Sequence, residues 1–531
     1  YDKEGRFIIA GIDRDGDENS QLYAVPPSGG QLKPIRVEEG ERHEFPFLSE
    51  DGKRLYYTST KDDPTYLKSY CYNLETGEEE TILEGSETAT YLIKASPDEK
   101  SFIYVKHFAN THIKAFVKRD DEEILLTPPT DAQHTVSDGV YISEEEIFLL
   151  TDYDADFTYL ARFDLGDKKF EKVLSLEGES LTKVKYNEDE NCLYLSSSKG
   201  VRDYLYRYEI KEDNLDKIDL PGVKYIQQFK VADSGNIYLL GMSSIRPFNI
   251  YKFSKDKSEW KELTNLRVPG VSEEELITPE VVSYQSYDDL EIEALYYKAK
   301  PKKDNGYTIF WPHGGPQAAE RMIFRSLFQL LLNRGYSIFA PNFRGSANYG
   351  LEFKKMVEGD WGEGPRLDNV EGLNWLIDNG YTDEDKILLM GGSFGGYMSL
   401  LLHGRHPEYF KAVVDIFGPS DLFSFIESVP EHWKPIMKQW IGDPVEDKEK
   451  ITEDSPINYL DNMTKPMLVI QGANDPRVVK EESDQIVKAL RDKGTEVEYM
   501  VLDDEGHGFS KKENEIKVYK KVLEFFDKYT D

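Results

Sequence analysis

The sequence has 531 residues, a length at which more than one domain is expected. Its formal net charge is −34 at pH 7, so its surface repels nucleic acid phosphates and anionic lipid headgroups. Aromatic residues make up 13% of the chain, which is too many for a disordered protein. We therefore expect a folded protein that binds neither nucleic acid nor membranes.

The cysteine content and the lack of long apolar segments limit the class of protein further. Cys71 and Cys192 lie in apolar, strand-like segments, where we expect buried structural thiols rather than a disulfide framework or a zinc site. No apolar run is long enough for a membrane-spanning helix. The sequence begins without a methionine or a signal sequence, which indicates that the native start is missing. We expect a cytoplasmic protein without metal or cofactor, and homo-oligomerisation stays open.

The first half of the sequence contains a repeated unit. Short apolar segments recur every 44 to 48 residues, and many of them follow a turn rich in Asp, Gly or Asn. They begin at Phe7, Leu55, Phe102, Ile147, Leu193 and Ile237. Each is followed by one or two further strands, and three or four strands per unit are typical of a β-propeller blade. Six blades are visible, a seventh upstream stays open, and an array of β-sandwiches is disfavoured by the even spacing.

From about Val281 onward, expected strands alternate with amphipathic helical segments. The strands are expected at 307–310, 336–339, 387–390, 412–414, 467–470 and 497–500, and helices at 324–334 and 481–493. This order predicts a mainly parallel sheet covered by helices. We interpret the acidic segment 268–275 as a solvated linker, and we place a β-propeller domain at 1–270 and a catalytic α/β domain at 271–531.

A G-x-S-x-G sequence at residues 391–395 lies between an expected strand and an expected helix. In this context Ser393 is expected to be a nucleophile on a strained turn. The flanking glycines prevent side chains from colliding with the neighbouring strand and helix, and the helix N-terminus favours developing negative charge. The alternative is a serine that caps a helix in a glycine-rich turn.

A serine nucleophile requires a base, and the base requires a carboxylate that orients it. His507 lies between two glycines just after the last expected strand, and Asp475 follows the strand at 467–470. The order Ser393, Asp475, His507 is the order found in α/β-hydrolases. We expect His403 and His406 to serve the end of a helix rather than a metal. Five other histidines show no partner pattern: His43, His107, His112, His134 and His432.

The tetrahedral intermediate of acyl transfer requires two hydrogen-bond donors for its oxyanion. The backbone N–H of Phe394, directly after the nucleophile, is expected to supply one of them. The second is expected from the loop at 313–316, which reads His-Gly-Gly-Pro and follows the strand at 307–310. Gly315 is the donor that we predict, and a plain turn is the alternative.

Together these motifs resemble the prolyl oligopeptidase family of serine peptidases, and within that family the acylaminoacyl peptidases. The resemblance rests on residues 313–316, 342–346, 391–397, 472–478 and 504–509. It implies a β-propeller joined to an α/β-hydrolase domain, with the active site in a cavity between them that admits only peptides and other small molecules. It also implies that Ser393, Asp475 and His507 form the catalytic triad. Arg477 is implied to bind a substrate carbonyl on the N-terminal side of the cleaved bond, and a surface salt bridge is the alternative.

The resemblance implies that the substrates are peptides whose first amino acid is acylated. Dipeptidyl peptidases hold a free amino terminus with a Glu pair on a short helix of the propeller, whereas the pairs Glu38-Glu39 and Glu144-Glu145 lie in expected turns. Esterase, small-molecule amidase, dipeptidyl peptidase and oligopeptidase activities stay open, as does a catalytically inactive interaction protein. Apolar candidates for the specificity pocket, which the sequence does not rank, are Phe417, Ile426, Trp433, Val478 and Val479.

Overall fold

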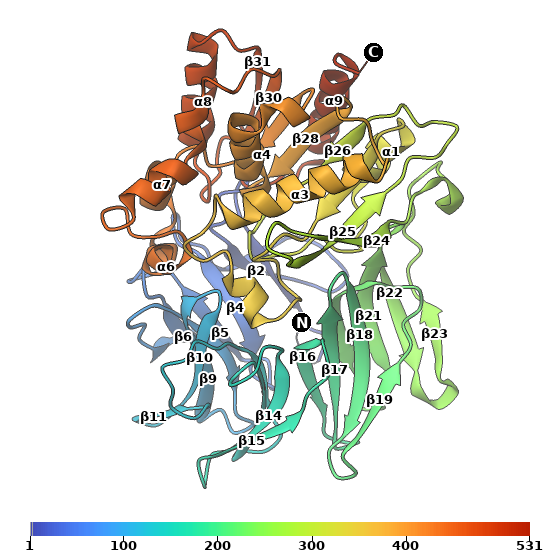
Figure 1. Ribbon diagram of the computed structural model, residues 1–531. Helices are drawn as coiled ribbons and strands as arrows, with labels where there is room; N and C mark the ends of the chain where they lie inside the picture. Colours follow the sequence, from blue (N-terminus) through green and yellow to red (C-terminus); the bar gives the residue numbers. More distant parts are fainter. Residues whose placement is uncertain (1, 3, 531) are drawn as a thin grey trace.

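Two domains stack on each other in the computed structural model, which describes Asp2 and residues 4–530 (Figure 1). The chain first builds a ring of six small sheets and then one eight-stranded sheet. The expected domain boundary at 270/271 falls between β23 (Glu259–Glu262) and β24 (Glu280–Gln285). None of the described helices combines the length and the apolar composition needed to cross a membrane.

The first domain is a six-bladed β-propeller, as the spacing of the apolar segments predicts. The first blade has three strands and each of the others has four, joined in chain order. The first three blades contain β1 (Ile8–Ile12), β2 (Gln21–Val25), β3 (Lys33–Arg36); β4 (His43–Leu48), β5 (Arg54–Ser59), β6 (Lys68–Asn73), β7 (Glu79–Leu83); and β8 (Ala89–Ala95), β9 (Ser101–Ala109), β10 (His112–Arg119), β11 (Glu122–Leu125). The last three contain β12 (Val136–Tyr141), β13 (Glu146–Thr151), β14 (Tyr159–Asp164), β15 (Lys169–Leu174); β16 (Ser180–Asn187), β17 (Cys192–Lys199), β18 (Arg202–Glu209), β19 (Asn214–Ile218); and β20 (Tyr225–Val231), β21 (Ile237–Ser243), β22 (Arg246–Ser254), β23.

The repeated apolar segments coincide with the second strand of blades two to six, and with β1 in the first blade. The second strands of blades two to six are largely buried on both faces because apolar side chains fill the space between neighbouring blades, whereas β1 is partly exposed. Cys71 and Cys192 belong to these cores as free thiols. One sequence repeat is therefore one blade, and the packing of blade on blade keeps its length nearly constant.

The second domain has a single sheet with the strand order β24-β25-β27-β26-β28-β29-β30-β31. Its strands after β24 are β25 (Glu291–Tyr297), β26 (Thr308–Phe310), β27 (Ser337–Pro341), β28 (Ile387–Gly392), β29 (Val413–Ile416), β30 (Met467–Gly472) and β31 (Val497–Leu502). β24 pairs antiparallel with β25, and β25 pairs antiparallel with β27. All neighbours from β27 to β31 in this order pair parallel. All six expected strands are present, so the prediction of an α/β-hydrolase fold is confirmed.

Helices cover both faces of this sheet (Figure 1). They are α1 (Ser326–Asn333), α2 (Leu351–Lys355), α3 (Gly364–Asp378), α4 (Phe394–Arg405), α5 (Leu422–Ser428), α6 (Lys434–Trp440), α7 (Lys448–Asp454), α8 (Lys480–Asp492) and α9 (Lys512–Asp527). Side chains of α3, α4 and α8 pack on one face with Phe310 and Leu389, whereas α1 and α9 pack on the other face with Ile309 and Leu388. Adjacent strand residues therefore point into different cores, which explains the nearly continuous apolar strands of the sequence.

Segment 268–275 lies between the two domains and most of its residues are exposed, as expected for a solvated linker, but one of its side chains is held in place. Ser272 caps a short 3₁₀-helix at Glu273–Glu275. The carboxylate of Glu273 pairs with Arg246 at 2.9 Å and with Arg267 at 2.5 Å, so the segment is held against the last blade. The acidic residues indicate a solvated segment when read alone, and their basic partners lie elsewhere in the sequence.

Polar contacts join the third and fourth blades of the propeller to the hydrolase domain. The side-chain amide of Asn110 donates to Oε1 of Gln317 at 2.9 Å, and Nζ of Lys354 donates to the carbonyl of Asn110 at 2.7 Å. The carboxylate of Asp156 accepts the backbone N–H of Glu352 at 2.8 Å. The third and fourth blades are thus fixed to the loop that follows β26 and to α2.

Candidate active site

Ser393 lies at the sharp turn between β28 and α4. Its backbone is left-handed, with φ 58° and ψ −124°, a strained conformation for a residue with a side chain. A Cβ on Gly391 would lie 2.1 Å from the carbonyl oxygen of Gly395, and one on Gly395 would lie 2.1 Å from that of Pro312. Only glycine fits at these two positions, so the G-x-S-x-G pattern follows directly from the packing of the turn.

The structure brings Ser393, His507 and Asp475 together from three loops. Oγ of Ser393 lies 2.9 Å from Nε2 of His507, and Nδ1 of His507 lies 2.6 Å from Oδ2 of Asp475. The side chain of His507 is 7% exposed and that of Asp475 is fully buried. A hydroxyl, an imidazole and a carboxylate thus form a continuous hydrogen-bonded chain in a site from which water is largely excluded.

The backbone after Asp475 holds its carboxylate in place. Oδ1 accepts the N–H groups of Arg477 at 2.9 Å and Val478 at 3.0 Å, while Oδ2 faces His507. Three hydrogen bonds therefore fix the carboxylate, and the imidazole is oriented with Nε2 toward Ser393.

The loop 313–316 lies directly against the serine. A Cβ on Gly314 would lie 3.3 Å from Cβ of Ser393. His313 anchors the loop, because its ring stacks on Phe343 at 4.3 Å and its Nε2 lies 2.9 Å from Oγ of Ser346. Burial lowers the pKa of His313 to about 4, so this imidazole stays neutral.

The two expected oxyanion donors lie at this same turn. Phe394 is the first residue of α4, so the helix offers no acceptor for its N–H. Gly315 follows the glycine that touches Ser393 and borders the cavity beside it.

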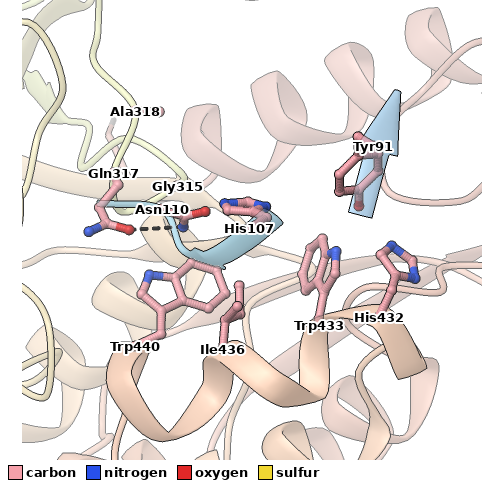
Figure 2. Close-up of a pocket in the computed structure, with 10 residues that line it drawn as sticks. All are labelled: Tyr91, His107, Asn110, Gly315, Gln317, Ala318, His432, Trp433, Ile436 and Trp440. Atoms are coloured by element: carbon pink, nitrogen blue, oxygen red, sulfur yellow. Dashed lines mark hydrogen bonds between the residues drawn. The ribbon is translucent and has the colours of Figure 1, made fainter. Parts of the chain in front are cut away.

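A cavity of about 290 Å³ opens between the two domains beside this loop (Figure 2). It is lined by Tyr91, His107, Asn110, Gly315, Gln317, Ala318, His432, Trp433, Ile436 and Trp440. Figure 2 shows Trp433, Ile436 and Trp440 on consecutive turns of one helical segment, facing the propeller residues Tyr91 and His107. The lining combines aromatic and aliphatic side chains with two histidines and two side-chain amides, and none of these described lining residues carries a carboxylate.

The predicted pocket residues have different positions. Trp433 lines the cavity. The ring of Phe417 packs on the ring of His507, with 4.4 Å between their centres. Val478 does not line the cavity as expected, because its side chain is buried in the core of the domain, and Ile426 packs against the same core. Val479 caps α8.

Sequence reasoning missed most of the cavity wall. Tyr91 and His107 come from adjacent strands of the third blade, where alternating aromatic residues look like ordinary propeller core. Trp440 and Ile436 show the helical spacing of a core-facing helix. No motif in the sequence distinguishes these residues from structural ones, and only the docking of the domains places them around one space.

Arg477 connects the active site with the first blade. Its Nε lies 2.6 Å from Oε1 of Glu18, and its guanidinium carbon lies 5.9 Å from the ring centre of Trp433. The side chain remains 43% exposed. The guanidinium therefore forms an ion pair across the domain interface and also lies near the wall of the cavity.

The loop between β1 and β2, residues 13–20, contacts both catalytic loops, and we call it the first-blade loop. A Cβ on Gly506 would lie 1.9 Å from the carbonyl oxygen of Gly16. Nζ of Lys511 donates to Asp15 at 2.6 Å, and the side-chain amide of Asn474 donates to the carbonyl of Asp15 at 3.1 Å. The propeller thus supports the backbone on both sides of the Asp475–His507 pair.

The histidines on α4 have structural partners. Nε2 of His403 accepts the backbone N–H of Lys465 at 3.0 Å, and burial lowers the pKa of His403 to about 3. His406 ends α4, and its Nε2 lies 2.6 Å from Nη1 of Arg366. His406 lies at the end of the helix, as the sequence predicts, whereas His403 holds the loop that precedes β30.

Comparisons with known proteins agree with this arrangement. The sequence model of the prolyl oligopeptidase family matches residues 322–531, and that of the dipeptidyl peptidase IV N-terminal region matches residues 2–114. Dipeptidyl aminopeptidase BIII of Pseudoxanthomonas mexicana is 41% identical over 219 residues, which cover 40% of this chain and 32% of that protein. Dipeptidyl peptidase family member 6 of Caenorhabditis elegans is 24% identical over 98% of this chain and 76% of that protein.

A puromycin-hydrolysing peptidase of Mycobacterium tuberculosis has the same fold. The structures superpose with a TM-score of 0.87 at 18% identity, over 99% of this chain and 85% of that one. The chain spans about a third of the length of the first relative and three quarters of the second, and the superposition shows the shared fold. Over residues 322–531 this chain therefore matches the prolyl oligopeptidase family.

Proposed function

We propose that this chain hydrolyses peptides with Ser393 as nucleophile, His507 as general base and Asp475 as the residue that orients the imidazole. The observation that carries the proposal is the hydrogen-bonded chain from Oγ of Ser393 through His507 to Asp475. Its distances of 2.9 and 2.6 Å suit proton transfer without a change of conformation.

The reaction proceeds through an acyl-enzyme. Oγ of Ser393 attacks the substrate carbonyl carbon while its proton passes to Nε2 of His507, and the carboxylate of Asp475 stabilises the imidazolium. The N–H groups of Phe394 and Gly315 hold the oxyanion. His507 then gives the proton to the leaving amine, and a water molecule hydrolyses the ester by the same steps in reverse order.

The cavity indicates which side chain precedes the cleaved bond. Its aromatic and aliphatic wall suits a bulky apolar side chain, because burying apolar surface is favourable. A lysine or arginine side chain would lose its hydration there without meeting a carboxylate. We therefore propose a preference for phenylalanine, tyrosine, leucine or methionine at this position.

The position of Arg477 indicates which chemical group precedes that residue in the substrate. Its guanidinium has donors to spare beyond the ion pair with Glu18, and a carbonyl of an acyl group is a suitable acceptor. Because Arg477 already occupies one carboxylate oxygen of Glu18, a substrate ammonium group would compete with it for this carboxylate. We propose that N-acylated amino acids are the preferred substrates.

Release of dipeptides is the second candidate. Glu18 places a carboxylate of the propeller at the edge of the active site, and a free amino terminus would need such a partner. The names of the two sequence relatives, one a dipeptidyl aminopeptidase and the other a dipeptidyl peptidase family member, favour this candidate.

Cleavage of three matched 4-nitroanilides distinguishes these candidates. We expect kcat/KM for N-acetyl-Phe to exceed that for Gly-Phe, and kcat/KM for N-acetyl-Phe to exceed that for N-acetyl-Lys, each about tenfold or more. A tenfold advantage of Gly-Phe would replace the acyl preference by dipeptide release. Turnover of N-acetyl-Phe esters without turnover of any anilide would instead make the chain an esterase.

A further inference from the structure

Three potential metal ligands converge outside the active site, at the step from the first blade to the second. Glu38 and Glu41 lie in the turn between β3 and β4, and His43 is the first residue of β4. One donor atom of each side chain lies within 4.8 Å of the others. Nε2 of His43 is 3.8 Å from Oε2 of Glu38 and 3.9 Å from Oε2 of Glu41.

The imidazole of His43 is buried without a partner for the nitrogen that faces the carboxylates. Its side chain is 0% exposed, and Nε2 forms no hydrogen bond. Its other nitrogen, Nδ1, lies 2.9 Å from Oγ of Ser59, which fixes the direction of the ring. Oε2 of Glu38 and Oε2 of Glu41 are likewise buried without a hydrogen bond to a described donor. Three lone-pair donors thus face one another, and leaving them so is unfavourable.

The neighbouring cations do not fill this gap. Arg36 donates from Nη2 to the other oxygen of Glu38 at 2.8 Å and lies 3.2 Å from Glu79. Lys61 pairs with Glu79 at 2.6 Å. Three carboxylates therefore face two basic side chains, and the unmatched negative charge lies toward His43. The acidic surface of the whole protein also attracts cations.

We propose that Glu38, Glu41 and His43 bind one divalent transition-metal cation, with zinc as the best match to one imidazole nitrogen and two carboxylate oxygens. Tetrahedral zinc with ligands about 2.0–2.2 Å away spaces its ligand atoms about 3.4 Å apart. The separations of 3.8 and 3.9 Å need to close by only about half an ångström. The carboxyl side chains are 36% and 31% exposed, which leaves an entry path and room for water as a further ligand.

A bound ion would stiffen the backbone around Glu38, Glu41 and His43. The side chain of Gln21 accepts the N–H of Glu38 and donates to the carbonyl of Glu41, each at 2.6 Å. The N–H of His43 donates to the carbonyl of Ser20 at 3.0 Å. Residue 20 ends the first-blade loop, so a cation here would stiffen the support of the catalytic loops from the propeller side. The sequence alone predicted no metal, since the three ligands show none of the familiar spacings.

Zinc titration of the full chain tests the proposal. After treatment with EDTA and dialysis, calorimetry with ZnCl₂ should show one tight site per chain, and zinc should raise the melting temperature. Equal concentrations of CaCl₂ should do neither, because calcium prefers six to eight oxygen ligands. Bound Co²⁺ should show visible d–d absorption that His43→Gln abolishes.

Variants separate this site from adventitious binding. Glu41→Gln, which keeps the size of a partly exposed side chain, should weaken zinc binding at least 100-fold. His112→Gln, which removes another histidine with an unpaired Nε2 but no facing carboxylate pair, should bind as wild type does. His507→Gln, which removes the triad as a zinc ligand, should also retain the site. Equal binding by wild type and Glu41→Gln, or no site tighter than millimolar, would overturn the proposal.

Discussion

The reactivity that we propose for Ser393 depends on its backbone as much as on His507. The left-handed conformation turns Oγ away from the sheet. The backbone packs so closely around Gly391 and Gly395 that the turn cannot change to an unstrained conformation. Strain of this kind is held by the surrounding structure, here by the strand β28 and the helix α4 on either side.

Ser393→Ala should lower kcat by about 10⁶-fold, the loss known for removal of a triad nucleophile. The melting temperature should stay unchanged, because alanine takes the same backbone position without losing a core contact. The buried Ser399, whose hydroxyl donates to the carbonyl of Gly395, provides the control Ser399→Ala. Labelling with a fluorophosphonate should mark the wild type and this control only, and a labelled Ser393→Ala would exclude Ser393 as nucleophile.

Asp415 gives the protein a pH-dependent stability that does not involve the triad. It is fully buried next to the nucleophile turn, where Oδ1 accepts the N–H of Gly418 and Oδ2 has no described partner. Burial raises the pKa of Asp415 from 3.8 to about 8. Between these values the folded protein keeps a proton that the unfolded chain releases, so stability falls as the pH rises from about 4 to about 8.

Asp415→Asn should remove this contribution to the pH dependence. Compared with wild type, the variant should gain stability steadily from pH 5 to pH 8, because the amide needs no proton to stay neutral. Urea unfolding at several pH values measures the difference. A constant difference in unfolding free energy across this range would show that Asp415 titrates normally.

Among the elements, α6 and the 3₁₀ turn before it determine the width of the cavity. Ile436 lies between the two tryptophans on the face that Figure 2 shows toward the propeller. Ile436→Phe should fill part of the cavity and lower kcat/KM for N-acetyl-Phe anilide roughly 10–100-fold, the range for a misfit of a few carbon atoms. Turnover of N-acetyl-Ala anilide serves as the internal control and should change little. If kcat/KM fell equally for both substrates, the cavity would not be where the phenylalanine side chain of the substrate binds.

The close contact between Gly506 in the His507 loop and Gly16 in the first-blade loop can be tested in the same way, with another glycine as the control. Gly506→Ala places a methyl group 1.9 Å from the carbonyl oxygen of Gly16, so the loop or the first blade must move. A displacement of about 1 Å costs on the order of 100-fold in rate, and we expect a loss of this size in kcat/KM. A Cβ on Gly11 in β1 would lie 3.9 Å from Leu22 and Ser20, an ordinary contact, so Gly11→Ala should retain activity. Similar losses in both variants would mean that the collision with Gly16 is not the cause.

At the scale of the whole molecule, the two domains share the site through Arg477 and Glu18. Arg477→Ala should lower kcat/KM for N-acetyl-Phe anilide roughly 10–100-fold, as expected for loss of a charged hydrogen bond. Glu18→Gln keeps the arginine but removes its partner, and it should cost less. The advantage of the acetylated substrate over Gly-Phe anilide should shrink in Arg477→Ala, and an unchanged ratio would argue against a contact between Arg477 and the acyl group.

The sequence predicts features that depend on local patterns, and it misses features that depend on contacts between residues far apart in the chain. The six strands of the hydrolase sheet, the propeller repeat and the convergence of Ser393, Asp475 and His507 follow from local patterns in a known order. The cavity does not, because its wall joins the third blade to a helix more than 300 residues away. Val478 follows a catalytic loop and is apolar, yet its side chain points into the core, a choice that only the packing of α8 decides.

The support of the catalytic loops by the first-blade loop has a consequence for damaged protein. Removal of the propeller would take away the contacts that it makes at Gly506, Asn474 and Lys511. The freed half would keep all three triad residues but lose the surface that holds two of their loops. Loss of the propeller would therefore disturb the candidate triad itself, because the first-blade loop holds the backbone beside Asp475 and His507.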